Sequence, residues 1–67
     1  MNNNYPKMYL KNWEIHKTPY GVLICGNIYN DIHNRFEDGL LIITNRVKSI
    51  NFDKKTVRTK NNKYNLE

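Results

Sequence analysis

Two short runs that are apolar on both faces constrain the fold of this chain most strongly. In residues 20–29, YGVLICGNIY, valine and isoleucine occupy one set of alternate positions, while leucine, cysteine and tyrosine occupy the other; residues 40–47, LLIITNRV, repeat the pattern. Such runs are typical of strands that are covered on both sides. Because a chain of 67 residues forms one small core, we expect a second copy of the protein to cover the remaining apolar face, making a homo-oligomer.

Alternating apolar and polar residues, rich in Val, Ile, Thr and Tyr, predict three further strands, at residues 9–15, 56–60 and 63–67. Polar segments with turn-forming residues, such as TPYG, FDKK and KNNK, separate the strands. We therefore predict a single all-β domain over residues 9–67. It is either a small, five-stranded, partly open barrel of the SH3-like or OB-like kind or a strongly curved antiparallel sheet.

Two segments fall outside this pattern. Residues 1–8 are expected to form a flexible N-terminal segment. Residues 30–36, NDIHNRF, suit one helical turn, because Asn30 or Asp31 would be an acceptable N-cap. This turn is the one helical element that the sequence indicates.

The single cysteine, Cys25, lies within the apolar run GVLICG. One cysteine allows no internal disulfide and indicates no cysteine-based zinc site, and a buried thiol of this kind behaves as a small hydrophobic residue. No apolar stretch approaches the roughly 20 residues of a membrane span, and the N-terminus has no apolar secretory segment. We therefore expect a cytoplasmic protein with no membrane association.

Positive charge is concentrated in the last third of the chain. Residues 1–45 contain four basic and four acidic residues, whereas residues 46–67 contain seven basic and two acidic residues, which accounts for the whole net charge of +5. A basic region of this kind favours an anionic partner such as a nucleotide or nucleic acid. A solvated, solubilising surface is the alternative, since outward lysines also keep edge strands from aggregating.

The segment HNRFEDG contains the first group of candidate ligand-binding residues. Arg35 offers a planar guanidinium that matches phosphate oxygens, and Phe36 offers a surface on which a base can stack. Asp38 and Gly39 would supply hydrogen bonds or line the pocket. The structural alternative is that Phe36 fills one end of the barrel, that Arg35 pairs with Glu37 or Asp31, and that Asp38 and Gly39 form a turn.

A second group interrupts the apolar run at residues 44–46. Alternation places Thr44 and Arg46 on one face near the end of the predicted strand, so a hydroxyl and a guanidinium would point to one place, which suits a phosphate. Asn45 would add a hydrogen bond, and Tyr29 is a candidate for stacking on a base or lining the pocket. Alternatively, the strand leaves the core here and these side chains meet water.

Catalysis and metal binding have little support in the sequence. The two histidines, His16 and His33, lie in different segments, and neither has a spacing to Cys25 or to a serine that fixes a nucleophile beside a base. We therefore expect a protein that is not an enzyme and that needs no metal or cofactor.

Several motifs together resemble a group of very short phage and prophage proteins. They are LKNWEI, GNIYN, RFEDG, IITNRV and VRTKNNKYNL, and they span about 58 residues, although the spacing from Thr59 to Tyr64 is one residue shorter than in that group. Proteins of that kind commonly oppose host immunity. Some of them are oligomeric sponges that sequester a nucleotide immune signal without cleaving it.

Three hypotheses follow for the function. The first is a phage anti-defence protein that sequesters a nucleotide second messenger, of the cyclic oligonucleotide or ADP-ribose type, with Arg35 and Arg46 on its phosphates. The second is a nucleic-acid-binding module that uses the basic C-terminal third. The third is an inhibitor that binds a host defence protein directly.

Overall fold

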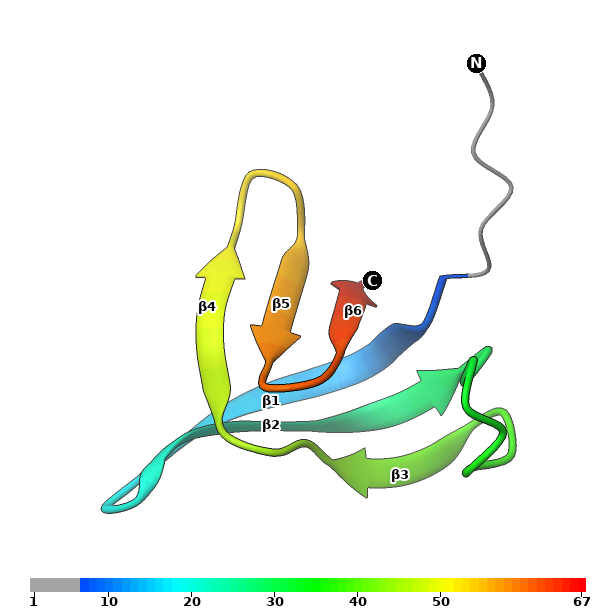
Figure 1. Cartoon of the computed structure of the whole chain (residues 1–67), viewed down its shortest axis with the longest axis horizontal. Coiled ribbons are helices and arrows are strands. Elements are labelled where there is room, and N and C mark those ends of the chain that lie inside the picture. Colours follow the sequence, from blue (N-terminus) through cyan, green and yellow to red (C-terminus); the bar gives the residue numbers. More distant parts are fainter. Residues whose placement is uncertain (1–6) are drawn as a thin grey trace.

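The computed structural model describes residues 7–67, which form one mixed six-stranded sheet (Figure 1). The strands are β1 (Tyr9–Thr18), β2 (Gly21–Tyr29), β3 (Leu40–Ile43), β4 (Val47–Asn51), β5 (Thr56–Thr59) and β6 (Lys63–Leu66). Their order in the sheet is β3-β2-β1-β6-β5-β4. Figure 1 shows that β4, β5 and β6 stand steeply to the long β1–β2 hairpin, so the sheet is sharply bent. Across residues 7–67 no helix of the length and hydropathy required to span a membrane occurs.

A β-bulge in β1 determines which side chains of this strand face the core. Lys11 pairs with Asn27, whereas Glu14 pairs with Cys25, so β1 contains one extra residue between these pairs. The extra residue shifts the alternation by one position. Leu10, before the bulge, is fully buried, and Trp13 after it also packs against the core.

The core lies inside the bend of the sheet and draws on both of its halves. Leu10, Ile24, Ile28 and Val57 have exposed fractions of 0%. They pack with other buried residues from β3, β6 and the segment before β1, namely Met8, Ile42, Tyr64 and Leu66. Burying the side chain of an isoleucine or leucine contributes roughly 1.5–3 kcal/mol. Contacts between the two halves therefore hold the bend closed.

The all-β class is confirmed, but the predicted strand count is wrong. The predicted strand at residues 40–47 ends at Ile43, and the chain turns through Thr44–Arg46 into an additional strand, β4. Thr44 causes this break, because its backbone N–H donates to the carbonyl of Ile24 (2.8 Å) and its hydroxyl accepts from the N–H of Ile24 (3.1 Å). The apolar alternation continues through Thr44 and gives no sign of the turn.

The arrangement of the strands also differs from the prediction. The sheet is not purely antiparallel, because β6 pairs with β1 in parallel, with Tyr9 opposite Asn65 and Leu10 opposite Leu66. The sheet does not close into a barrel, since β3 and β4 are its two edges, and the SH3-like or OB-like kind stays a prediction. The helical turn predicted at residues 30–36 is absent; a tight turn with a hydrogen bond from the N–H of Asn34 to the carbonyl of Asp31 occurs instead.

The two runs that are apolar on both faces have different positions in the sheet. β2 is an interior strand between β1 and β3, as its pattern predicted. β3 is an edge strand, and Leu41 and Ile43 on its outer face are 66% and 70% exposed. The predicted flexible segment, residues 1–8, lies largely outside the described residues, but Met8 is 3% exposed and belongs to the core.

Candidate functional site

The candidate residues from the sequence fall into two groups at opposite ends of β2. The first group belongs to the loop of residues 30–39, which follows the end of this strand (Figure 1). The second group, Thr44–Arg46, lies beside Gly21 at the start of the strand. The fold therefore does not bring Arg35 and Arg46 to the same place within one chain.

Arg35 is part of an ion pair that organises the loop. Its Nη2 donates to Oδ1 of Asp31 (3.1 Å) and its Nε donates to Oδ2 (3.2 Å), a two-point contact. The carboxylate of Asp31 also accepts from the backbone N–H groups of His33, Arg35 and Phe36. The geometry matches the structural alternative for Arg35, and its guanidinium directs two of its N–H donors to Asp31 rather than to a ligand.

The hydrogen bonds to Asp31 lower its pKa. Desolvation by burial raises the pKa, but the hydrogen bonds from the Arg35 side chain and from the backbone of His33 and Arg35 outweigh it, so the pKa falls from 3.8 to about 2. The side chain of Asp31 is 1% exposed. Its ionised form is therefore a structural anchor of the loop.

The other loop candidates also have structural contacts. Phe36 packs against the core, with the Arg35 guanidinium 5.0 Å from its ring centroid. The carboxylate of Asp38 accepts from the N–H of Asn30 (2.7 Å). Gly39, with a φ of +89°, turns the chain into β3, and its N–H donates to the carbonyl of Ile28.

Tyr29 lies on the outer face of the sheet. Its ring stacks on Tyr9, with the centroids 5.4 Å apart and the planes 11° from parallel. The ammonium of Lys11 lies over both rings, 5.8 Å from the Tyr9 centroid and 5.2 Å from the Tyr29 centroid. This stack is a feature of the β1–β2 hairpin and lies away from Arg46.

The second group of candidates lies at a groove. Thr44 is 6% exposed and uses its hydroxyl within the protein, accepting from Ile24 and donating to the carbonyl of Asn45. Arg46 extends over Gly21, where an added Cβ would be 2.8 Å from Cδ of the arginine, and its Nη1 donates to the carbonyl of Tyr20 (3.3 Å). The glycine thus allows the arginine stem to lie against the β1–β2 turn and holds its guanidinium at the groove.

Three basic residues from two parts of the sequence line this groove. Arg46 precedes β4, Lys48 belongs to β4, and Lys60 comes from the turn between β5 and β6. The groove has a volume of about 720 Å³, within the range of small-molecule sites, and is completed by Leu23, Thr44, Asn45 and Val47. We call it the basic groove. Its lining contains three cations and no carboxylate.

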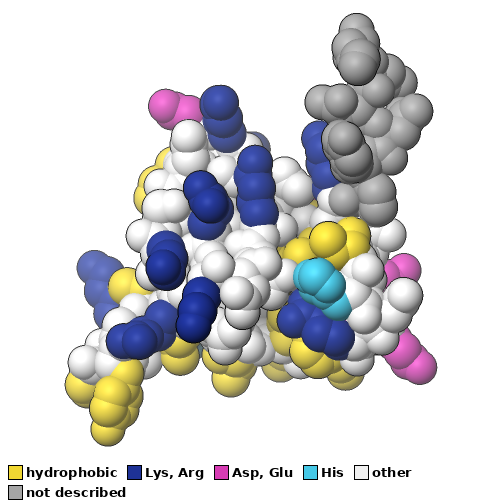
Figure 2. All heavy atoms as spheres, viewed as in Figure 1, with side chains coloured by type: hydrophobic (Ala, Val, Ile, Leu, Met, Phe, Trp, Pro, Cys, Tyr) yellow, Lys and Arg dark blue, Asp and Glu magenta, His cyan; other side chains and the backbone are white. Residues whose placement is uncertain are grey.

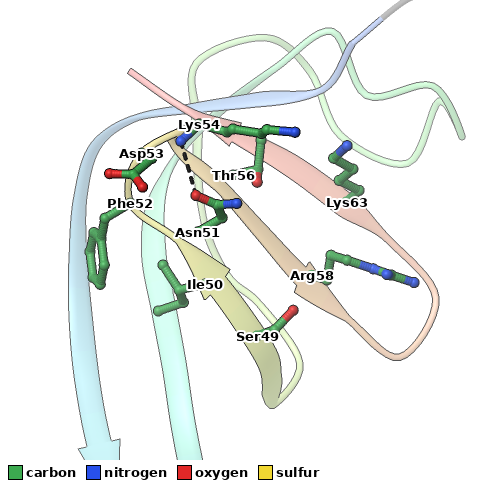
Figure 3. A pocket seen from close by; sticks show the side chains of 9 residues that line it. All are labelled: Ser49, Ile50, Asn51, Phe52, Asp53, Lys54, Thr56, Arg58 and Lys63. Carbon is green, nitrogen blue, oxygen red and sulfur yellow. Dashed lines mark hydrogen bonds between the residues drawn. The ribbon is translucent and has the colours of Figure 1, made fainter.

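The basic surface continues from this groove across β5 and β6. Figure 2 shows lysine and arginine side chains gathered on this face of the molecule. A second hollow, of about 610 Å³, lies over the β4–β5 hairpin and is lined partly by Lys54, Arg58 and Lys63 (Figure 3). Phe52 also lines this hollow, and in Figure 3 its ring points away from Arg58 and Lys63.

These cations are not neutralised by ion pairs. The ion pairs among residues 7–67 are Arg35 with Asp31 and, when the histidine is protonated, His16 with Glu14. Arg58 and Lys63 are directly opposite each other on β5 and β6, and like charges in this position destabilise a sheet. An anion bound on this surface would relieve the repulsion.

The sequence pointed to three of the seven residues that line the basic groove. Thr44, Asn45 and Arg46 were candidates, and all three line it, although the Thr44 hydroxyl is turned inward. The sequence singled out neither Lys48 nor Lys60 as part of this groove. The concentration of positive charge after residue 45 was the signal for both lysines, but it could not show which of the seven basic residues converge.

Comparisons with protein-family models, with curated proteins and with solved structures give no significant match for this chain. The similarity to short phage proteins therefore stays a prediction.

The Asp31 anchor predicts that the protein loses stability in acid. Because the folded pKa of Asp31 lies below its unfolded value, its contribution is present above about pH 4 and is lost as the pH falls towards 2. A shift of this size corresponds to roughly 2 kcal/mol. Urea unfolding at several pH values should show this loss, and Asp31→Asn should be destabilised at pH 7 and lose less stability in acid.

Glu37→Gln is the matched control, because Glu37 is an exposed loop residue in no ion pair among residues 7–67. It should keep the pH profile of the parent. An Asp31→Asn protein with unchanged stability at pH 7 would contradict the anchor.

Proposed function

We propose that this protein binds a phosphate-bearing nucleotide in the basic groove and sequesters it without cleaving it. The observation that carries this proposal is the convergence of Arg46, Lys48 and Lys60 around one groove with no carboxylate in its lining. Guanidinium and ammonium groups form charge-assisted hydrogen bonds with phosphate oxygens. The similarity to short phage proteins extends the proposal to an anti-defence role, in which the nucleotide is a bacterial immune signal.

The composition of the groove supports binding of a nucleotide. Arg46, Lys48 and Lys60 provide the cations of the lining, and Leu23 and Val47 provide apolar contacts for a base or ribose. The side chain of Asn45 can add hydrogen-bond donors and acceptors. A combination of apolar lining with a few polar groups is typical of small-molecule sites.

The same lining favours sequestration over hydrolysis. Its residues include no aspartate, glutamate, histidine or cysteine. These are the side chains that most often act as a general base or nucleophile.

A nucleic-acid strand is the second candidate ligand. Arg58 and Lys63 continue the positive surface beyond the basic groove, and a row of separated cations suits a polyanion. Phe52 lines the same hollow and is 64% exposed, but its ring points away from Arg58 and Lys63, so a base stacked on it would lie apart from these two cations. The convergence of three cations on the basic groove favours the nucleotide.

We also propose that the protein is a homo-oligomer whose copies meet at the outer face of β3. Leu41 and Ile43 form an exposed apolar strip on this edge strand. Exposed apolar side chains on an edge strand invite pairing with another chain. The similar phage proteins include oligomers, which supports a second copy as the partner rather than a host protein.

Removing the groove cations should weaken nucleotide binding. A hydrogen bond to a charged group contributes roughly 1.5–3 kcal/mol, so Arg46→Gln and Lys60→Gln should each reduce affinity by about 10-fold or more. Calorimetric titration with cyclic dinucleotides, cyclic trinucleotides and ADP-ribose would measure this. The ligand recovered after denaturation should be intact.

Lys11→Gln is the control for the change in charge, because this exposed lysine lies on the outer face of β1 and does not line the groove. Its affinity should equal that of the parent. If no nucleotide binds while a single-stranded oligonucleotide binds with a steep dependence on salt, the nucleic-acid candidate replaces the first. Groove variants that bind as well as the parent would refute the site.

Replacing Ile43 should disrupt the oligomer. Because its side chain is 70% exposed, Ile43→Lys should leave the fold intact and place a charge in the interface. Sedimentation at micromolar concentration should show an oligomer for the parent and a monomer for this variant, whereas Ile32→Lys, in the 30–39 loop, should behave as the parent. A parent protein that is a strict monomer would end this proposal.

A further inference from the structure

Three metal-ligating side chains lie together on the outer face of the β1–β2 hairpin. They are Glu14 and His16 from β1 and Cys25 from β2, and their ligand atoms all lie within 4.8 Å of one another. None of them lines the basic groove or the second hollow. We propose that Glu14, His16 and Cys25 form a Zn²⁺ site with water at the fourth position.

The pairing of the two strands creates this cluster. Glu14 lies directly opposite Cys25, and His16 lies two positions along β1 on the same face. The bulge between Lys11 and Glu14 is essential, because without the extra residue Glu14 and His16 would face the same side as Leu10, which is buried in the core. The bulge thus turns two ligands towards the cysteine.

The contacts differ from those of a catalytic cysteine. In a nucleophile–histidine–acid triad, the acid holds one ring nitrogen of the histidine and the nucleophile contacts the other. Here Sγ of Cys25 lies 3.1 Å from Nε2 of His16, and Oε1 of Glu14 lies 3.4 Å from the same Nε2. Two acceptors and one ring nitrogen therefore converge on a single point, where a shared cation would fit.

Two ligand-to-ligand distances lie near those of tetrahedral zinc. Usual Zn–S, Zn–N and Zn–O bond lengths place sulfur and nitrogen ligands about 3.6 Å apart and nitrogen and oxygen ligands about 3.4 Å apart. The N–O distance already agrees, and the S–N distance needs to open by about 0.5 Å. The side chains of His16 and Glu14 are 51% and 75% exposed, so they can rotate by this amount.

The types of ligand atom in this cluster favour zinc over magnesium and calcium. A thiolate and an imidazole are typical zinc ligands, whereas magnesium and calcium prefer oxygen alone. Three protein ligands leave one coordination position for water, the arrangement of an open rather than a closed zinc site. The sequence did not indicate this site. It contains one cysteine and so no cysteine motif for zinc, and the three ligands come together only because of the bulge in β1.

The test uses the untagged, reduced protein with Zn²⁺ and with Co²⁺ as a spectroscopic probe. Native mass spectrometry and competition with a chromophoric chelator should show one Zn²⁺ per chain. Co²⁺ should give a thiolate charge-transfer band together with the intense visible bands of tetrahedral coordination. No uptake at equimolar metal and micromolar protein would overturn the proposal.

Variants identify the ligands. Cys25→Ser and His16→Gln should each weaken Zn²⁺ binding by 100-fold or more, and His16→Gln keeps the test decisive if Cys25→Ser fails to fold. His33→Gln is the matched control, because His33 is exposed and contacts Asn62 instead; it should bind as the parent does. Equal binding by His16→Gln, or a Co²⁺ spectrum without the thiolate band, would contradict the site.

Discussion

The pairing of β1 with β2 is the constraint on which the rest of the structure depends. β1 is also the strand that joins the two halves of the sheet, because β2 lies on one side of it and β6 on the other. The bulge after Lys11 shifts the alternation of side chains in β1, so that Trp13 faces the core and Glu14 faces outward. The packing of the core and the cluster beside Cys25 both follow from this one irregularity.

A second local interaction produces the basic groove. Thr44 bonds to the backbone of Ile24 through both its amide and its hydroxyl, which ends β3 and directs the chain into β4. Arg46 and Lys48 then lie close to Lys60, because Val47 pairs with Thr59 at the start of β4. The threonine thus shapes the groove, while its own hydroxyl forms hydrogen bonds within the protein.

The sequence predicted the all-β class and the interior position of β2, because a run that is apolar on both faces is typical of a strand covered on both sides. It could not predict the break at Thr44, since the alternation is unchanged there and the partner, Ile24, is distant in the chain. The sequence left open whether Arg35 pairs with Glu37 or with Asp31. In the structure Arg35 pairs with the buried carboxylate of Asp31. The convergence of basic residues on one groove depends on tertiary structure and was likewise beyond the sequence.

The proposed nucleotide site places phosphate groups at the basic groove rather than at the loop around Arg35. A titration of ¹⁵N-labelled protein with pyrophosphate and with a cyclic dinucleotide, followed by amide NMR spectra, distinguishes the two places. If phosphate binds at the groove, the shifted amides should be those of residues 44–48 and Lys60, while the loop of residues 30–39 should be unchanged. Shifts confined to that loop, or none for either ligand, would contradict the proposed site.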